Sequence, residues 1–177
     1  VSVTHHFVEL AGEQPGIYYG YYFLELADYF GHEGTDEREM MNLLYVTVKA
    51  LLNKNISNRL VRCIYELRTM AVQGLMPELL NCAACGREFA EKEELFFSQE
   101  VHGIIGKECL GKVSDTRRLS PAARYAMIYI VSAPMGKLYT FTVTEEVLGE
   151  LEYHIHRYVY QNTDKKFKSL DILEMMC

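Results

Sequence analysis

The sequence has 177 residues, of which 49% are hydrophobic and 24% are charged. This composition is typical of a globular domain with one sizeable core and excludes a mainly disordered chain. The formal charge of −6 at pH 7 opposes attraction of the whole chain to a phosphate backbone, so any contact with nucleic acid has to be local.

The start of the sequence and its cysteines indicate a cytoplasmic location. The first residue is valine, and no charged segment followed by an apolar stretch and a cleavage site is seen there. We expect the sequence to be part of a longer, soluble protein. The longest apolar stretch, residues 43–52, is much shorter than the roughly 20 residues that span a bilayer, so no membrane contact is expected. An odd set of five cysteines favours a reducing compartment and a metal site over a disulfide framework.

Three helices are predicted in the first part of the chain. Apolar residues recur at intervals of three and four through 17–30, which is the pattern of a well-buried helix that ends at the glycine that follows. Asp36 has a glutamate three residues later, which predicts the start of a second helix that stops near residues 53–55. Ser57 is the expected N-cap of a third helix, which ends at Gly74.

The helical pattern is lost between residue 81 and about residue 112. Glycines separate short apolar stretches there, which predicts a small β-containing insertion. Helical signals return at Ser120, which is followed by a proline at the first helical position, and Pro134 ends this helix. Thr144 is the expected cap of a further helix, and a short helix is predicted over 169–176.

These elements predict a mainly α fold, namely a helical bundle domain that is interrupted by a small zinc-ribbon-like β insertion. We expect residues 1–79 to form the first part of the helical domain, residues 80–112 the insertion, and residues 113–177 the second part of the helical domain.

The insertion begins with the segment Cys82-Ala83-Ala84-Cys85-Gly86, which has the form of a zinc knuckle. A tight turn of this kind aims two thiolates at one tetrahedral centre, and a closed site needs two further ligands. Gly106 stands where a second C-x-x-C pair would supply the fourth thiol, so a histidine or Glu108 has to complete the shell. The candidate zinc ligands are Cys82, Cys85, Cys109 and His102.

Two other interpretations of these cysteines stay open. They are consistent with buried thiols in a ribbon that hydrophobic contacts hold together without metal. They are also consistent with a redox pair, although such a pair normally opens a helix after a buried strand, and the glycine and arginine that follow Cys85 do not fit that context.

Other polar residues give weaker indications. His154 and His156 point about 200° apart on a helix, so they cannot share one metal ion, and His5 and His6 at the start are assigned no role. The tyrosines of 18–22 are expected to serve packing rather than base stacking. No P-loop, nucleophile elbow or H-E-x-x-H helix is present, so no enzymatic activity is predicted. The candidate contacts to nucleic acid or to a partner are Arg117, Arg118, Lys165, Lys166 and Lys168.

Four segments together resemble the C-terminal region of the bacterial RecO family of DNA repair proteins. They occur in the order 22–28, 66–86 with the knuckle, 118–121 (Arg-Leu-Ser-Pro) and 168–173 (Lys-Ser-Leu-Asp-Ile-Leu), and they cover most of the chain from residue 7 onward. The resemblance implies a helical domain with an inserted zinc finger, preceded by an OB-fold that we expect to lie outside this sequence.

The resemblance also implies a function. Members of this family are recombination mediators that act in the RecF pathway together with RecR, contact the C-terminal tail of single-stranded DNA-binding protein, support recombinase loading and anneal complementary strands. Single-stranded DNA is expected to bind mainly through the OB-fold. The sequence departs from the family in the missing fourth cysteine, which affects the expectation of zinc.

Two alternative functions remain. The first is a zinc-ribbon protein-interaction module of an unrelated, transcription-associated protein, which the knuckle between helices would fit. The second is a cysteine-dependent oxidoreductase, which rests on Cys82 and Cys85 alone and predicts thiols that alkylate rapidly at neutral pH.

Overall fold

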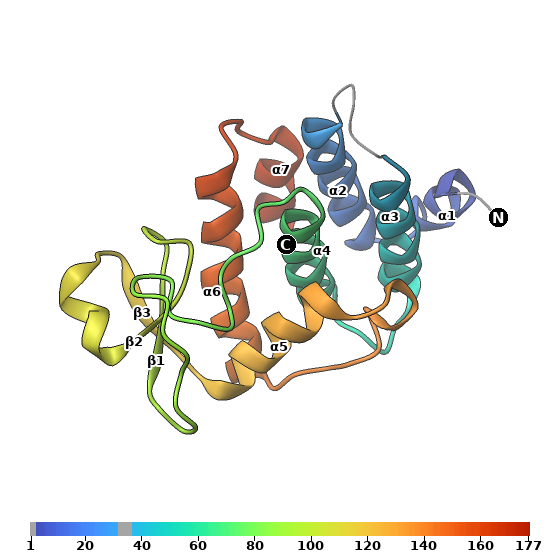
Figure 1. Ribbon diagram of the computed structural model, residues 1–177. Coiled ribbons are helices and arrows are strands. Elements are labelled where there is room, and N and C mark those ends of the chain that lie inside the picture. The colour runs from blue at the N-terminus through green and yellow to red at the C-terminus, as the bar shows by residue number, and fades with distance from the viewer. Residues whose placement is uncertain (1–2, 32–36) are drawn as a thin grey trace.

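The computed structural model describes residues 3–31 and 37–177, and it consists of helices with one small sheet (Figure 1). The predicted fold class, mainly α with a small β insertion, is confirmed. None of the helices in these residues is both long and apolar enough to cross a bilayer. Before the sheet come α1 (Val3–Leu10), α2 (Gly16–Phe30), α3 (Glu37–Leu52) and α4 (Asn58–Val72), and after it come α5 (Pro121–Ser132), α6 (Glu145–Asn162) and α7 (Lys168–Met176).

Side-chain caps set the starts of three helices where the sequence predicted them. The hydroxyl oxygens of Ser57, Ser120 and Thr144 each accept a hydrogen bond from the amide three residues later, at 3.2, 3.1 and 3.2 Å. Such a cap satisfies one of the amides that a helix leaves unpaired in its first turn. The cap predicted at Asp36 lies outside the described residues.

Helix α4 lies at the centre of the bundle, in contact with α2, α3, α5 and α6, while α7 packs on α2 (Figure 1). Aromatic rings fill much of this core: the rings of Phe23 and Tyr65 are 4.4 Å apart, and Tyr65 donates a hydrogen bond to the Phe23 carbonyl at 2.9 Å. Tyr19 and Tyr22 are buried, in accord with the packing role predicted for them, whereas Tyr21 is exposed.

A buried carboxylate joins three of these helices. Glu66 on α4 is 1% exposed and accepts hydrogen bonds from the Tyr22 hydroxyl on α2 at 2.6 Å and from Arg62 Nε at 3.2 Å. Nδ1 of His156 on α6 lies 2.5 Å from its other oxygen. Burial by itself raises the pKa of Glu66, but the charges of His156 and Arg62 outweigh that effect and lower it to about 2. His156 is therefore engaged in the bundle and points away from His154, as predicted.

The sheet has three antiparallel strands with β1 (Leu95–Ser98) between β2 (Gly103–Gly106) and β3 (Thr116–Leu119). The 3-10 helix η1 (Lys107–Lys112) connects β2 to β3, and a second one, η2 (Met135–Lys137), follows α5. Strand β3 was not anticipated, and it lies beyond residue 112, where the sequence analysis placed the end of the insertion. The three-part division itself remains a prediction.

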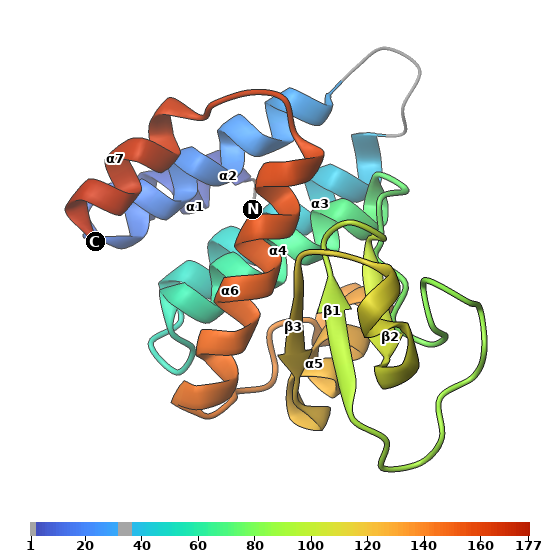
Figure 2. The same ribbon diagram turned by 90° about the vertical axis from the view of Figure 1, so that its left-hand side faces the viewer.

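The sheet lies against α6 and α5 at the end of the molecule opposite α1 (Figures 1 and 2). Its two faces have different partners because successive strand residues point to opposite sides. Phe97, Ile104 and Leu119 belong to the same hydrophobic core as the helices. Ile105 points the other way and packs with Cys82 and Cys109 in a second, smaller cluster, which places the cysteines on the outer face of the sheet.

Candidate metal centre and basic surface

The knuckle is held against β2 by backbone hydrogen bonds. The Ala83 amide donates to the Ile104 carbonyl and the Cys82 amide to the Arg87 carbonyl, at 2.8 and 2.9 Å. Gly86 closes the turn with a φ of +81°, a conformation that glycine adopts without the steric cost other residues incur. The sequence C-x-x-C-G therefore folds into the tight turn that its residues predicted.

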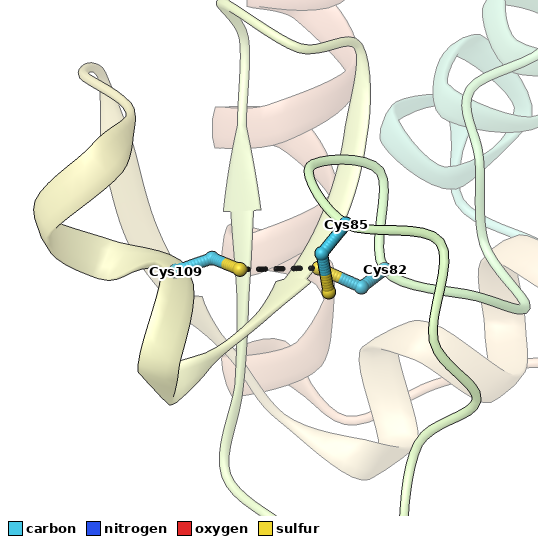
Figure 3. A group of neighbouring side chains, drawn as sticks. All are labelled: Cys82, Cys85 and Cys109. Atoms are coloured by element: carbon cyan, nitrogen blue, oxygen red, sulfur yellow. Dashed lines mark hydrogen bonds between the residues drawn. The ribbon is translucent and has the colours of Figure 1, made fainter.

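The three predicted cysteine ligands are brought together from two segments (Figure 3). Cys82 and Cys85 come from the knuckle and Cys109 from η1, and their sulfur atoms all lie within 4.8 Å of one another. Two sulfurs bound to one zinc ion at about 2.3 Å with tetrahedral angles are about 3.8 Å apart. The Sγ atoms of Cys82 and Cys109 are 3.8 Å apart, so this pair fits a tetrahedral ion.

The surroundings of the sulfurs also favour metal binding. Burial opposes ionisation of Cys82, but donation to its sulfur by the backbone amides of Gly106, Cys85 and Ala84 outweighs burial and lowers its pKa to about 7. Burial and the two neighbouring sulfurs raise the pKa of Cys109 to about 11. A cation at the centre would favour the thiolate form of all three residues.

His102 does not lie in this sulfur group. In the described part of the chain, no fourth histidine, cysteine or carboxylate belongs to it. The backbone of His102 has a φ of +57°, and its ring packs edge-on against Tyr158 of α6, with the centroids 6.0 Å apart. The residues present therefore fit an ion that takes three ligands from the protein.

Arg87, next to the knuckle, is a part of this region that the sequence analysis did not single out. Its guanidinium makes a bidentate contact with Glu93, at 2.9 and 2.7 Å, and also donates to Glu108, the residue before Cys109. These charge-assisted hydrogen bonds join the knuckle loop to η1, which are the two segments that carry the cysteines. Its position directly after the C-x-x-C-G turn was the available signal.

The candidate basic contacts form two separate groups. Arg117 and Arg118 are exposed on β3, and the Arg117 guanidinium lies 3.9 Å from the ring centroid of Tyr153 on α6. The other three, Lys165, Lys166 and Lys168, lie between α6 and the first turn of α7, and Nζ of Lys165 is 3.5 Å from a Glu25 oxygen.

Other arginines noted as basic are used within the fold. Arg59 pairs with Glu145 and Glu152 of α6, at 2.6 Å each, and Arg68 donates to the carbonyls of Ile130 and Ala133 at the end of α5. Arg117 and Arg118 are thus the arginines among these that stay exposed on one strand, which leaves β3 as a local basic surface on an acidic chain.

These features define a class: a helical domain that carries a small three-stranded sheet with a cysteine knuckle on its outer face. Comparison with known proteins gives the particular family. The family described as "Recombination protein O C terminal" matches residues 16–171, and the chain belongs to this family.

Individual relatives agree with this assignment. The chain is 22% identical over 175 residues to a DNA repair protein RecO of Acetivibrio thermocellus, a match that covers 99% of this chain and 69% of the relative. It is 26% identical over 155 residues to RecO of Desulforamulus reducens, covering 88% and 59%, and 28% identical over 141 residues to RecO of Caldanaerobacter subterraneus, covering 77% and 56%. The chain thus spans between 56 and 69% of the length of these relatives.

Proposed function

We propose that this chain is the partner-binding C-terminal region of a recombination mediator in DNA repair. In this role it supports recombinase loading and strand annealing together with RecR, and it contacts the acidic C-terminal tail of single-stranded DNA-binding protein without catalysing a reaction. The observation that carries the proposal is the family match over residues 16–171. The net charge of −6 supports a role in which protein partners, rather than DNA, provide most of the contact with this chain.

We also propose that Arg117 and Arg118 on β3 make local contacts to phosphate or to an acidic tail. Both are exposed, and neither has a carboxylate partner among the ion pairs of the described residues. The three lysines between α6 and α7 are a second candidate surface, but Lys165 is already paired with Glu25. Such contacts fix orientation without reading sequence.

A zinc ion at Cys82, Cys85 and Cys109 is the third part of the proposal. When bound, it would join the knuckle to η1 and so stabilise the outer face of the sheet. The sulfur geometry and the amide donors to Cys82 support it.

The partner role is tested by binding measurements on the purified chain. A fluorescent peptide with the acidic tail of single-stranded DNA-binding protein should bind, and an oligonucleotide should bind weakly, with an affinity that falls steeply as salt is raised. The double variant Arg117→Ala/Arg118→Ala should weaken binding of the ligand that β3 contacts, whereas Lys137→Ala, an exposed lysine on η2, should not. Tight, salt-insensitive DNA binding by this chain, or no binding of the peptide, would contradict the proposal.

A further inference from the structure

Position 106 is where the spacing C-x-x-C would place a fourth thiol opposite the knuckle, and it holds glycine. The space beside this glycine is filled. A Cβ atom added at Gly106 would lie 2.2 Å from Nη2 of Arg87 and 3.1 Å from a carboxylate oxygen of Glu108. The Arg87 guanidinium therefore stands where a ligand side chain from position 106 would begin.

Arg87 is fixed in this place by several partners. Glu93 binds it through both carboxylate oxygens, Glu108 binds Nη2, and Nη1 donates to the Glu88 carbonyl at 3.0 Å. Glu93 is itself anchored, because its Oε1 accepts from the Ala90 amide at 2.6 Å. A bidentate arginine with a second carboxylate is a geometrically specific cross-link. It joins the same two segments, the knuckle loop and η1, that a fourth metal ligand would help to join.

One side of the sulfur group faces solvent. Cys82 and Cys109 are each 2% exposed and pack with Ile105, whereas Cys85 is exposed and the Glu108 side chain is 69% exposed. An ion held by these three sulfurs would have protein on one side and water on the other. Zinc sites with three protein ligands keep their fourth position for a small exchangeable ligand, in contrast to closed structural sites.

We propose that Arg87 has replaced the fourth protein ligand as a cross-link, and that the metal site keeps an open coordination position which accepts a small exogenous thiol. The inference rests on the zinc site proposed above. The soft thiolate ligands of the site favour a further sulfur ligand over an oxygen ligand at the open position. The metal in this chain is then exchangeable rather than purely structural, because the Arg87 cluster holds the knuckle to η1 in its absence.

Cobalt absorption tests the open position directly, because Co²⁺ replaces zinc in tetrahedral sites and its visible bands report on the ligands. The metal content of the purified chain is measured first, then zinc is exchanged for Co²⁺ without oxygen, and 2-mercaptoethanol is added. We expect the visible bands of the wild-type protein to change saturably, with about one thiol bound per cobalt and with the cobalt still bound after desalting. Wild-type bands that do not respond to the thiol would overturn the open position.

Two double variants separate the role of Arg87 from that of the open position. Arg87→Ala/Gly106→Cys supplies a fourth thiol and removes the guanidinium, so its cobalt spectrum should not respond to added thiol. Since changes beyond the ligands alter metal affinity about 10- to 100-fold, we expect this variant to bind cobalt at least about tenfold more tightly. Arg87→Ala/Gly106→Ala removes the guanidinium without adding a ligand, and its spectrum should respond as the wild type does.

The outcomes also distinguish this inference from the zinc proposal. Absence of zinc and of cobalt binding in the wild type would overturn both. Cobalt binding with an unresponsive spectrum that becomes responsive in Glu108→Gln would keep the metal site but assign its fourth position to Glu108, and would overturn the inference alone. Unfolding of the metal-free wild type, measured by circular dichroism after chelation, would also overturn the proposed cross-link role of Arg87 and leave the zinc site standing.

Discussion

His154 shows at the residue scale how the sheet is joined to the helices. It lies on α6, is 2% exposed, and its ring is 5.3 Å from that of Phe97 on β1. Its backbone oxygen accepts from Nε2 of Gln99 at 3.1 Å, in the loop after β1. The neutral ring is thus part of the interface between the helices and the sheet.

We predict that His154 makes this interface sensitive to acid. Burial lowers its pKa to about 4 from a reference value of 6.5, assisted by Arg117 and Arg157 and opposed by a backbone contact to Arg118 and by Glu150. Between these two pH values the unfolded chain binds the proton and the folded chain does not, so folding stability falls as pH drops below about 6.5. At about 1.4 kcal/mol for each pKa unit, the loss approaches about 3 kcal/mol near pH 4.

Urea unfolding across pH 4 to 7 checks this prediction. Other groups titrate in the same range, so the comparison is with His154→Phe and with His154→Gln, which keeps a hydrogen-bond donor. Both variants should lose stability less steeply than the wild type as pH falls. Equal slopes for the three proteins would show that His154 does not titrate in the folded state as its surroundings indicate.

At the scale of elements, one close backbone approach fixes the start of the sheet to the end of the helical body. The Glu78 amide donates to the His102 carbonyl and the Ile104 amide to the Glu78 carbonyl, at 2.9 and 2.8 Å. Gly103 lies between these partners, and a Cβ added there would meet the Glu78 oxygen at 2.6 Å. Only glycine allows the two backbones to pair at this distance.

We therefore predict that Gly103→Ala destabilises the protein by about 2 kcal/mol, because the methyl group forces the segment before the knuckle away from β2. Gly149→Ala is the matched control: Gly149 is exposed within α6, and an added Cβ meets nothing within 4 Å. It should stabilise the protein by about 0.5–1 kcal/mol through its helix propensity. Thermal unfolding of both variants measures the difference, and a Gly103→Ala protein as stable as the wild type would rule out the tight approach.

At the scale of the whole molecule, two adjacent strand residues separate the common core from the metal region. Ile104 and Ile105 are both fully buried on β2, but Ile104 belongs to the core shared with the helices and Ile105 to the cysteine cluster. The sheet is therefore one cooperative unit with the bundle on one face, while its other face supports only the knuckle and η1.

Native-state hydrogen exchange of two alanine variants should reveal this division. Ile104→Ala should lower the free energy of global unfolding by about 3 kcal/mol and reduce the protection of α4 and β1 amides together. Ile105→Ala should reduce protection of the knuckle and η1 amides and leave α4 close to the wild-type value. Loss of α4 protection in both variants to the same extent would mean that the two clusters unfold as one.

The sequence by itself determined the elements whose signals are local. Ser57, Ser120 and Thr144 cap their helices as predicted because a cap needs only a side-chain oxygen and an amide three residues away. The C-x-x-C-G turn folds as expected for the same reason. The family resemblance also followed from the sequence, and the match over 16–171 confirmed it.

Only the tertiary structure decided the features that depend on distant partners. Helix α1, eight residues long, was not predicted because so short a helix is stable only through packing, here on α2 and α3. Strand β3 was missed because its pattern, Thr-Arg-Arg-Leu, becomes a strand only beside β1. The same limit applies to the metal centre: spacing brought Cys82 and Cys85 together, but the approach of Cys109, the separate position of His102 and the place of Arg87 against Gly106 depend on how η1 folds back over the sheet.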